Sequence, residues 1–225
     1  MRRTKHERER ATKQRPDRLG RNNEAVDTDH ETRIVRTVAE TWQTMIDDKQ
    51  PLPLTPTHCI LGARAGVEAL TYFGLPAKAV AVIATVRNQP AVALARQGIP
   101  TDQWPQHAWS LSVGRPGDEE RAVAESAGRG MNLHLVIEIP DSWIVDLSAG
   151  QFDRNDYDLH VPGPIVTAGG FDTANRCSTT TPRGTLVTYE RRVPAPQWRQ
   201  SLDWTINYRN FARELINRSR PLLQP

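Results

Sequence analysis

Apolar residues recur at helical spacing in three stretches of the chain. From Glu31 to Ile46 they fall at steps of three and four, which predicts one buried face of a helix. The same spacing follows Cys59 until Gly74 ends the pattern, and a third amphipathic stretch covers residues 197–218. Three prolines in "KQPLPLTPTH" separate the first two helices, because proline cannot continue a helix.

Between the second and third helices, the pattern predicts mainly strands. The run "AKAVAVIATVR" is continuously apolar, which is typical of a buried strand, whereas "HAWSLSV" alternates. A short helix is predicted at residues 91–97, between these two strands. The pattern predicts two strands joined at "PDS", namely "MNLHLVIEI" and "SWIVDLSA". It also predicts two weaker strands at "GPIVTAG" and "TLVTYERRV". This order of elements predicts an α+β fold, in which N-terminal helices pack on a mostly antiparallel sheet and a C-terminal helix closes the domain.

The net positive charge of the chain lies in its first 30 residues. Residues 1–30 hold nine Lys/Arg and six Asp/Glu, which accounts for the whole net charge of +3. Residues 1–29 have too few apolar side chains to bury, so we expect a disordered basic tail before a single domain at residues 30–225. The tail is either simply solvated or makes a weak contact with nucleic acid.

Composition also narrows the class of protein. No run of about 18 apolar residues occurs, and no apolar stretch follows the charged N-terminus, so we expect neither a membrane contact nor a secretory signal. The two cysteines, Cys59 and Cys177, lie far apart and outside any CxxC pair. We therefore expect a reduced, cytoplasmic protein without a metal or another cofactor.

Cys59 stands where the second helix begins. Free backbone N–H groups and the helix dipole favour a thiolate at this position, and the same N–H groups can receive an oxyanion. A cysteine in this position can equally be a small buried apolar residue. The nucleophilic reading requires a general base beside the thiol.

His134 is the candidate base, and Asp146 is its candidate partner. A three-residue loop at Ile139–Asp141 would set the two side chains directly opposite each other on one face of the hairpin. A two-residue loop would place them on opposite faces, so the strand register decides the hypothesis. In the favourable register, Asp146 could hold one ring nitrogen of His134 and direct the other toward Cys59.

The segments "HCILGARAGVEALTYFG", "NLHLVIEI" and "WIVDLSAGQF" place Cys, His and Asp in the order of a known superfamily. Within residues 57–153 the chain resembles papain-like cysteine peptidases, and most of all their transglutaminase-like branch. The resemblance implies a papain-like fold with Cys59 as nucleophile, His134 as base and Asp146 as the orienting acid. It also implies acyl transfer through a thioester acyl-enzyme, as a peptidase, an amidase or a transglutaminase-like transferase. The expected substrates are peptides, proteins or small amides.

The resemblance is incomplete at the oxyanion hole. Papain itself has a glutamine six residues before the cysteine, where this chain has Pro53. Gln43, on the first helix, is the candidate substitute. His58 adjoins Cys59 and is an auxiliary candidate, although adjacent residues point apart. A catalytically inactive papain-like binding module is the alternative, with the basic tail contacting nucleic acid or an assembly partner.

Two acidic residues close to the expected site have no role in this scheme. Glu138 follows His134 on the same strand, and Asp153 follows the "DLSAGQF" segment. Either of them could bind a cationic group of the substrate.

Overall fold

The structure is a computed structural model that describes residues 28–48, 58–114, 134–192 and 208–224. Its α-helices are α1 (Thr28–Asp48), α2 (His58–Tyr72), α3 (Gln89–Arg96) and α5 (Tyr208–Leu223). Its strands are β1 (Lys78–Arg87), β2 (Ser110–Val113), β3 (His134–Ile139), β4 (Trp143–Asp146), β5 (Ile165–Ala168), β6 (Arg176–Thr180) and β7 (Leu186–Arg191). Short 3-10 helices lie at Thr101–Gln103 (η1), Ala149–Phe152 (η2) and Asn155–Tyr157 (η3).

The strands form one sheet in the order β5-β4-β3-β1-β7-β6, with β2 also pairing with β1. Each of the described strand pairs is antiparallel. The long strand β1 has β3 along its first half and β2 along its second half, while β7 pairs with its other edge. The two end strands, β5 and β6, contact each other, so the sheet nearly closes. The α+β class and the mostly antiparallel sheet predicted from the sequence are confirmed.

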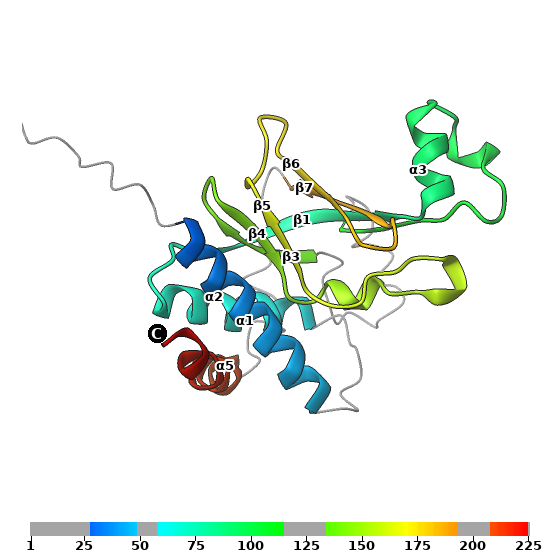
Figure 1. Ribbon diagram of the computed structural model, residues 1–225. Coiled ribbons are helices and arrows are strands. Elements are labelled where there is room, and N and C mark those ends of the chain that lie inside the picture. The colour runs from blue at the N-terminus through cyan, green and yellow to red at the C-terminus, as the bar shows by residue number, and fades with distance from the viewer. Residues whose placement is uncertain (1–27, 49–57, 115–133, 193–207, 225) are drawn as a thin grey trace, which may run out of the picture.

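Helices α1, α2 and α5 lie together on one side of the sheet, whereas α3 projects from its far end (Figure 1). The helix α2 contacts β1, β3 and β4 and therefore supports the hairpin that carries His134 and Asp146. The helix α5 packs against α1 and α2, and closes this layer. The predicted closing C-terminal helix is thus present.

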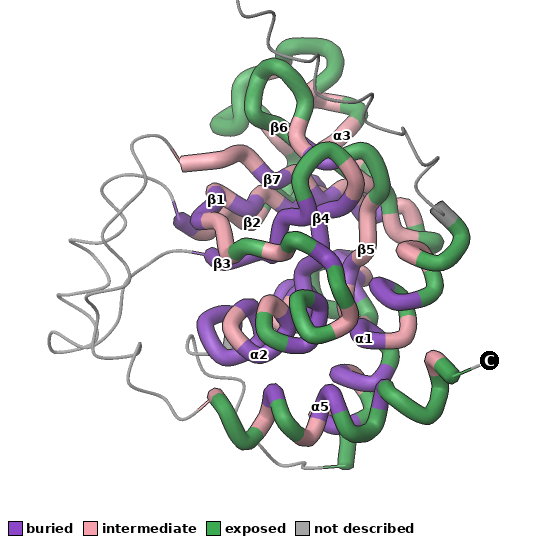
Figure 2. Tube along the Cα trace, turned by 90° about the vertical axis from the view of Figure 1, so that its left-hand side faces the viewer, coloured by how far each residue is buried: buried purple, intermediate pink, exposed green. Residues whose placement is uncertain are grey.

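The described residues form two apolar cores, one on each side of the sheet. Leu135, Ile137 and Ile139 of β3 face the helices, and Val136 between them belongs to the second core. This alternation matches the faces predicted for the strand. Because both faces are covered, every residue of β3 and β4 is buried (Figure 2).

The structure corrects several boundaries. The first helix begins at Thr28, so the predicted tail at residues 1–29 overlaps it, while residues 1–27 lie outside the described residues. The strand β6 was not predicted, because "RCSTT" is mainly polar and only Cys177 is buried in it. The last helix extends to Leu223, beyond the predicted end at residue 218, and the first part of that prediction lies outside the described residues.

The hairpin register also differs from the prediction. Ile139 pairs with Trp143, so the three-residue loop is Pro140–Ser142 and starts one residue later than expected. The shift has a local cause, since Pro140 has no N–H and Asp141 adopts a positive φ of 61°, a conformation that Asp tolerates in turns. His134 and Asp146 are therefore not directly opposed. They remain on the same face, as diagonal neighbours.

Two glycines bring α2 close to the hairpin. Gly62 and Gly66 follow Cys59 on one face of the helix, at spacings that place them above one another. A Cβ at Gly66 would collide with Ile137 Cδ1 and would lie 2.7 Å from Leu147 Cδ1. A Cβ at Gly62 would lie 3.3 Å from Leu147 Cβ. Because glycine has no side chain at these two positions, α2 can pack close to β3, and this sets the distance of its N-terminal end from the strand.

In the part of the chain that the structure describes, no helix combines the length and the apolar character needed to cross a membrane.

Candidate functional site

Cys59 is the second residue of α2 and is 3% exposed. Its thiol hydrogen bonds to the ring of His134, the first residue of β3. The close packing of α2 against the hairpin thus brings together two residues that are 75 positions apart in the sequence. Such a contact between a thiol at a helix start and an imidazole is the geometry that activates a cysteine nucleophile.

Asp146 holds the other side of the same ring. Its Oδ2 lies 2.6 Å from Nε2 of His134, and both side chains are completely buried. With Nε2 engaged by the carboxylate, Nδ1 is the ring nitrogen that remains for other partners. The structure therefore brings Cys59, His134 and Asp146 into one cluster, which we call the Cys59 cluster.

The carboxylate of Asp146 accepts four hydrogen bonds. Tyr189 donates its hydroxyl to Oδ2 at 2.8 Å, in addition to the bond from His134. Ser148 donates both its backbone N–H and its hydroxyl to Oδ1, each at 3.0 Å. These donors hold a fully buried negative charge that would otherwise be strongly disfavoured.

Burial and charge act in opposite directions on this pair. Burial alone would lower the pKa of His134, but Asp146 outweighs it through its charge and its hydrogen bond. Together with the contact to Cys59, these interactions raise the pKa of His134 from 6.5 to about 10. Burial would raise the pKa of Asp146, whereas the charge and hydrogen bond of His134 and the Tyr189 hydroxyl lower it below its usual range. The pair is therefore poised to carry an imidazolium and a carboxylate.

Aromatic rings hold the imidazole from two sides. The ring of Tyr189 is nearly parallel to that of His134, at 10°, with centroids 6.2 Å apart. Phe152 approaches it at a centroid distance of 5.0 Å. Burial and its bond to Asp146 raise the pKa of Tyr189 well above 10, so its hydroxyl stays a hydrogen-bond donor. Tyr189 was not identified from the sequence, because it comes from β7, far from the quoted motif.

Gln151 is a second residue that sequence reasoning missed. It lies in η2, just after Asp146, and its amide Nε2 is 3.0 Å from Nδ1 of His134. The "DLSAGQF" phrase that carries the family resemblance contains this glutamine, so the signal was present in the sequence. What was absent was the turn at Ala149–Phe152, which folds the side chain back onto the ring.

A cavity of about 160 Å³ adjoins the Cys59 cluster. Gln151 and Ser148 form part of its wall, opposite residues of α1 that include Trp42, Gln43 and Asp47. Because Gln151 also touches His134, this side chain lies between the cavity and the imidazole ring. Ligand sites are typically concave and combine apolar walls with a few polar groups, as this cavity does.

The auxiliary candidates are placed less favourably. The amide of Gln43 donates to Asp47 at 2.8 Å, one turn further along α1, and its Oε1 lies against Gly163. The prediction that Gln43 completes the oxyanion hole gains no support from this placement, because its amide is turned toward its own helix. His58 is the first residue of α2, and its side chain lies outside the described residues.

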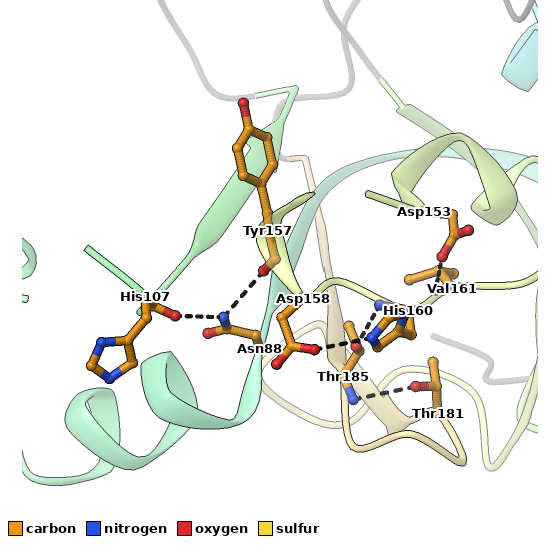
Figure 3. A network of polar contacts seen from close by, with 9 residues as sticks. All are labelled: Asn88, His107, Asp153, Tyr157, Asp158, His160, Val161, Thr181 and Thr185. Carbon is orange, nitrogen blue, oxygen red and sulfur yellow. Dashed lines mark hydrogen bonds and ion pairs between the residues drawn. The ribbon is translucent and has the colours of Figure 1, made fainter. Parts of the chain in front are cut away.

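Neither acidic residue proposed for a cationic substrate group is simply free for that role. Glu138 is buried and forms ion pairs with Lys78 and Arg191. Asp153 accepts a hydrogen bond from the backbone N–H of Val161 at 2.8 Å, in a polar region that also holds His160 (Figure 3). In the same region Asn88 donates to the carbonyls of His107 and Tyr157, which ties η3 to the start of α3. These contacts are those of a structural network.

Within the described ranges, no group of three or more His, Cys, Asp or Glu side chains is arranged to hold a metal ion. The second cysteine, Cys177, is buried in β6, where burial and the charge of Asp172 raise the pKa of its thiol. Both cysteines are free of disulfide bonds.

Comparison of the chain with protein-family models, with curated proteins and with solved structures finds no match. The chemistry of the site must therefore be argued from its own geometry.

Proposed function

We propose that this protein is a cysteine-nucleophile acyl-transfer enzyme, acting as a peptidase, an amidase or a transglutaminase-like transferase. The observation that carries the proposal is the position of His134, which lies between the Cys59 thiol and the Asp146 carboxylate within a buried cluster. A structural histidine can satisfy its two ring nitrogens with any hydrogen-bonding groups. A histidine that joins a thiol at a helix start to a buried acid has the arrangement of a general base.

The proposed reaction begins with proton transfer from Cys59 to Nδ1 of His134. The Sγ atom attacks the carbonyl carbon of an amide or ester, forming an S–C bond, and the carbonyl π electrons move to oxygen. When the tetrahedral intermediate collapses, the bond to the leaving group breaks and Nδ1–H of His134 protonates that group. A thioester remains on Cys59. Water or an amine then attacks the thioester carbonyl and gives its proton to Nδ1 of His134, while the S–C bond breaks and Sγ leaves as the thiolate. Attack by water corresponds to hydrolysis and attack by an amine to transfer.

Asp146 has two tasks in this scheme. Its bond to Nε2 fixes the ring orientation and leaves Nδ1 facing the thiol, and its charge stabilises the imidazolium. Tyr189 and Ser148 keep the carboxylate in place by filling its remaining acceptor positions. The sheet, the helix carrying Cys59 and the order of the three residues also support the proposed kinship with the papain-like, transglutaminase-like enzymes.

The experiment combines thiol labelling with acylation by a small activated ester. Wild-type protein should react rapidly with iodoacetamide at Cys59, and p-nitrophenyl acetate should release p-nitrophenolate as acetyl is transferred to the same thiol. Mass spectrometry should locate both adducts on Cys59. Cys177→Ala is the matched control, because it removes the other buried cysteine and should leave both reactions unchanged.

Two results would contradict the proposal. The first is labelling of wild-type Cys59 no faster than in His134→Ala, since the imidazole would then have no influence on the thiol. The second is the absence of an acetyl adduct on Cys59, because a thiol that forms no thioester cannot carry the proposed reaction. Either result would favour the alternative of an inactive binding module.

A further inference from the structure

Gln151 occupies a position that the proposed reaction does not yet use. Its Nε2 lies 3.0 Å from Nδ1 of His134, the nitrogen that takes up the thiol proton in the proposed reaction, and its side chain also lines the adjoining cavity. The amide nitrogen of glutamine can only donate a hydrogen bond. This contact is a hydrogen bond only while Nδ1 carries no proton, and in that state Nε2–H donates to Asp146.

Protonation of the ring changes what Gln151 can do. Once Nδ1 carries a proton, it can no longer accept from the Gln151 amide, and that N–H needs another acceptor. The imidazolium is present while the thiolate attacks and while the tetrahedral intermediate exists. In this interval the substrate oxygen carries its negative charge beside Sγ, and Sγ itself contacts the His134 ring.

We propose that Gln151 is the side-chain donor of the oxyanion hole, and that protonation of His134 releases its N–H to the developing oxyanion. The inference rests on the proposed function and deepens it. A hydrogen-bond donor near the reacting sulfur stabilises the C–O⁻ group that forms as the S–C bond is made. When the carbonyl reforms and Nδ1–H passes its proton to the leaving group, the Gln151 N–H returns to Nδ1.

The contacts of the two glutamines favour Gln151 as the oxyanion-hole donor over Gln43, the residue expected from the sequence. Gln43 lines the same cavity, but its amide donates to Asp47 on its own helix. Gln151 is half-buried and held in η2, immediately after the strand that supplies Asp146. It can therefore contribute a preorganised dipole at little cost in side-chain entropy.

Two probes separate oxyanion stabilisation from ring positioning. Acylation by p-nitrophenyl acetate passes through a tetrahedral oxyanion, and its leaving group departs without needing a proton. Alkylation by iodoacetamide is a direct displacement at a CH₂ group, so no oxyanion forms. Loss of an oxyanion-hole donor should slow acylation alone, whereas a misplaced imidazole should slow both reactions.

The variants are Gln151→Ala and Gln151→Glu, with Gln103→Ala, at an exposed residue of η1 outside the cavity, as the control. Gln151→Ala should slow acylation by roughly 10²- to 10³-fold, the usual cost of one oxyanion donor, and leave the alkylation rate unchanged. Gln151→Glu keeps a polar side chain of similar length but replaces the donor by an acceptor, so its acylation should fall at least as far. Gln103→Ala should match the wild type in both reactions.

Equal slowing of acylation and alkylation in Gln151→Ala would overturn the assignment and make Gln151 a positioning residue only. Unchanged acylation would remove any catalytic role for it. Both results presuppose acylation of the wild type, so they differ from failure of the proposed function, which is the absence of wild-type acylation.

Discussion

His134 Nε2 lies 2.6 Å from Asp146 Oδ2, although the two residues are diagonal rather than direct neighbours across the β3–β4 hairpin. A shift of the loop by one residue displaces the pairing by two, so both side chains keep the same face. The diagonal separation is bridged by the length of the imidazole. A carboxylate in this position can orient a histidine without being its partner in the ladder.

Substitution of Asp146 should separate ring orientation from charge. Asp146→Asn keeps one acceptor oxygen but places an amide N–H against groups that are themselves donors, so part of the network of Tyr189 and Ser148 is lost. We expect acylation to slow, by no more than the roughly 10⁴-fold known for the same change in a serine triad. Asp146→Ala should be slower still, because nothing then holds Nε2. Initial rates with p-nitrophenyl acetate provide the measurement.

Asp153→Asn is the matched control for these variants. Its carboxylate accepts from Val161 N–H instead of from His134, so acylation should stay within the wild-type range. If Asp146→Asn and Asp153→Asn were equally active, the buried acid would have no part in orienting the imidazole.

The stability of the fold should depend on pH through His134. Its folded pKa is raised from 6.5 to about 10, so the stabilisation is fully present below about pH 6.5 and is lost as the pH rises toward 10. The pKa of Asp146 is lowered, so its contribution is present above the pKa of an unfolded Asp, roughly 4, and is lost as the pH falls. The wild-type advantage over His134→Gln should therefore shrink between pH 6.5 and 10. At pH 6 we expect it to be on the order of 3 to 5 kcal/mol, as for other broken buried pairs.

Urea unfolding at pH 6, 8 and 10 gives these free energies. His160→Gln is the control, because its ring contacts the exposed carboxylate of Asp158 and takes no part in the buried pair. A constant difference between wild type and His134→Gln at all three pH values would show that the imidazole does not titrate in the folded protein as described.

Tyr189→Phe tests how much the hydrogen bond from the Tyr189 hydroxyl stabilises the Asp146 carboxylate. The substitution keeps the ring beside His134 and removes only the hydroxyl that donates to Asp146. Loss of a hydrogen bond to a charged group should lower the free energy of unfolding by about 1.5 to 3 kcal/mol. Tyr157→Phe, at an exposed ring, should cost less than about 0.5 kcal/mol. Equal unfolding free energies for the two variants would mean that the Tyr189 hydroxyl does not stabilise the buried carboxylate.

Gly66→Ala tests the close approach of α2 to the hairpin. Alanine normally stabilises a helix relative to glycine, by up to about 1 kcal/mol. Here the added Cβ would displace Ile137 and Leu147, and overpacking of a core costs about 1 to 3 kcal/mol. We therefore expect net destabilisation in urea unfolding and slower labelling of Cys59. Higher stability than the wild type would show that the helix does not depend on this contact for its position.

Much of the fold could be predicted from the sequence because its apolar pattern is strong where the core is deep. The continuous run of β1 and the alternation of β3 both reflect burial, and the helix after Cys59 follows its apolar spacing. The polar strand β6 carries no such pattern, since its side chains other than Cys177 are not buried. Periodicity detects burial and therefore misses a strand whose side chains are mostly exposed.

Only the residue types and their order along the chain allowed the candidate site to be predicted from the sequence. Cys59, His134 and Asp146 could be chosen because their residue types and order matter together. The exact register could not, since it depends on the αL conformation of Asp141 in the turn. Tyr189 reaches the site from β7, on the far side of β1, and such a long-range contact leaves no mark in the local sequence.

The glycines of α2 reduce the conformational freedom of Cys59, the proposed nucleophile. A helix packed this closely has few ways to rock against the sheet, so Cys59 loses its freedom when the chain folds. A substrate that reaches the thiol then meets a group already fixed in place, and its binding energy need not be used to immobilise the attacking atom. In the proposed reaction, the folded protein thus holds the attacking sulfur in a near-attack position before any substrate binds.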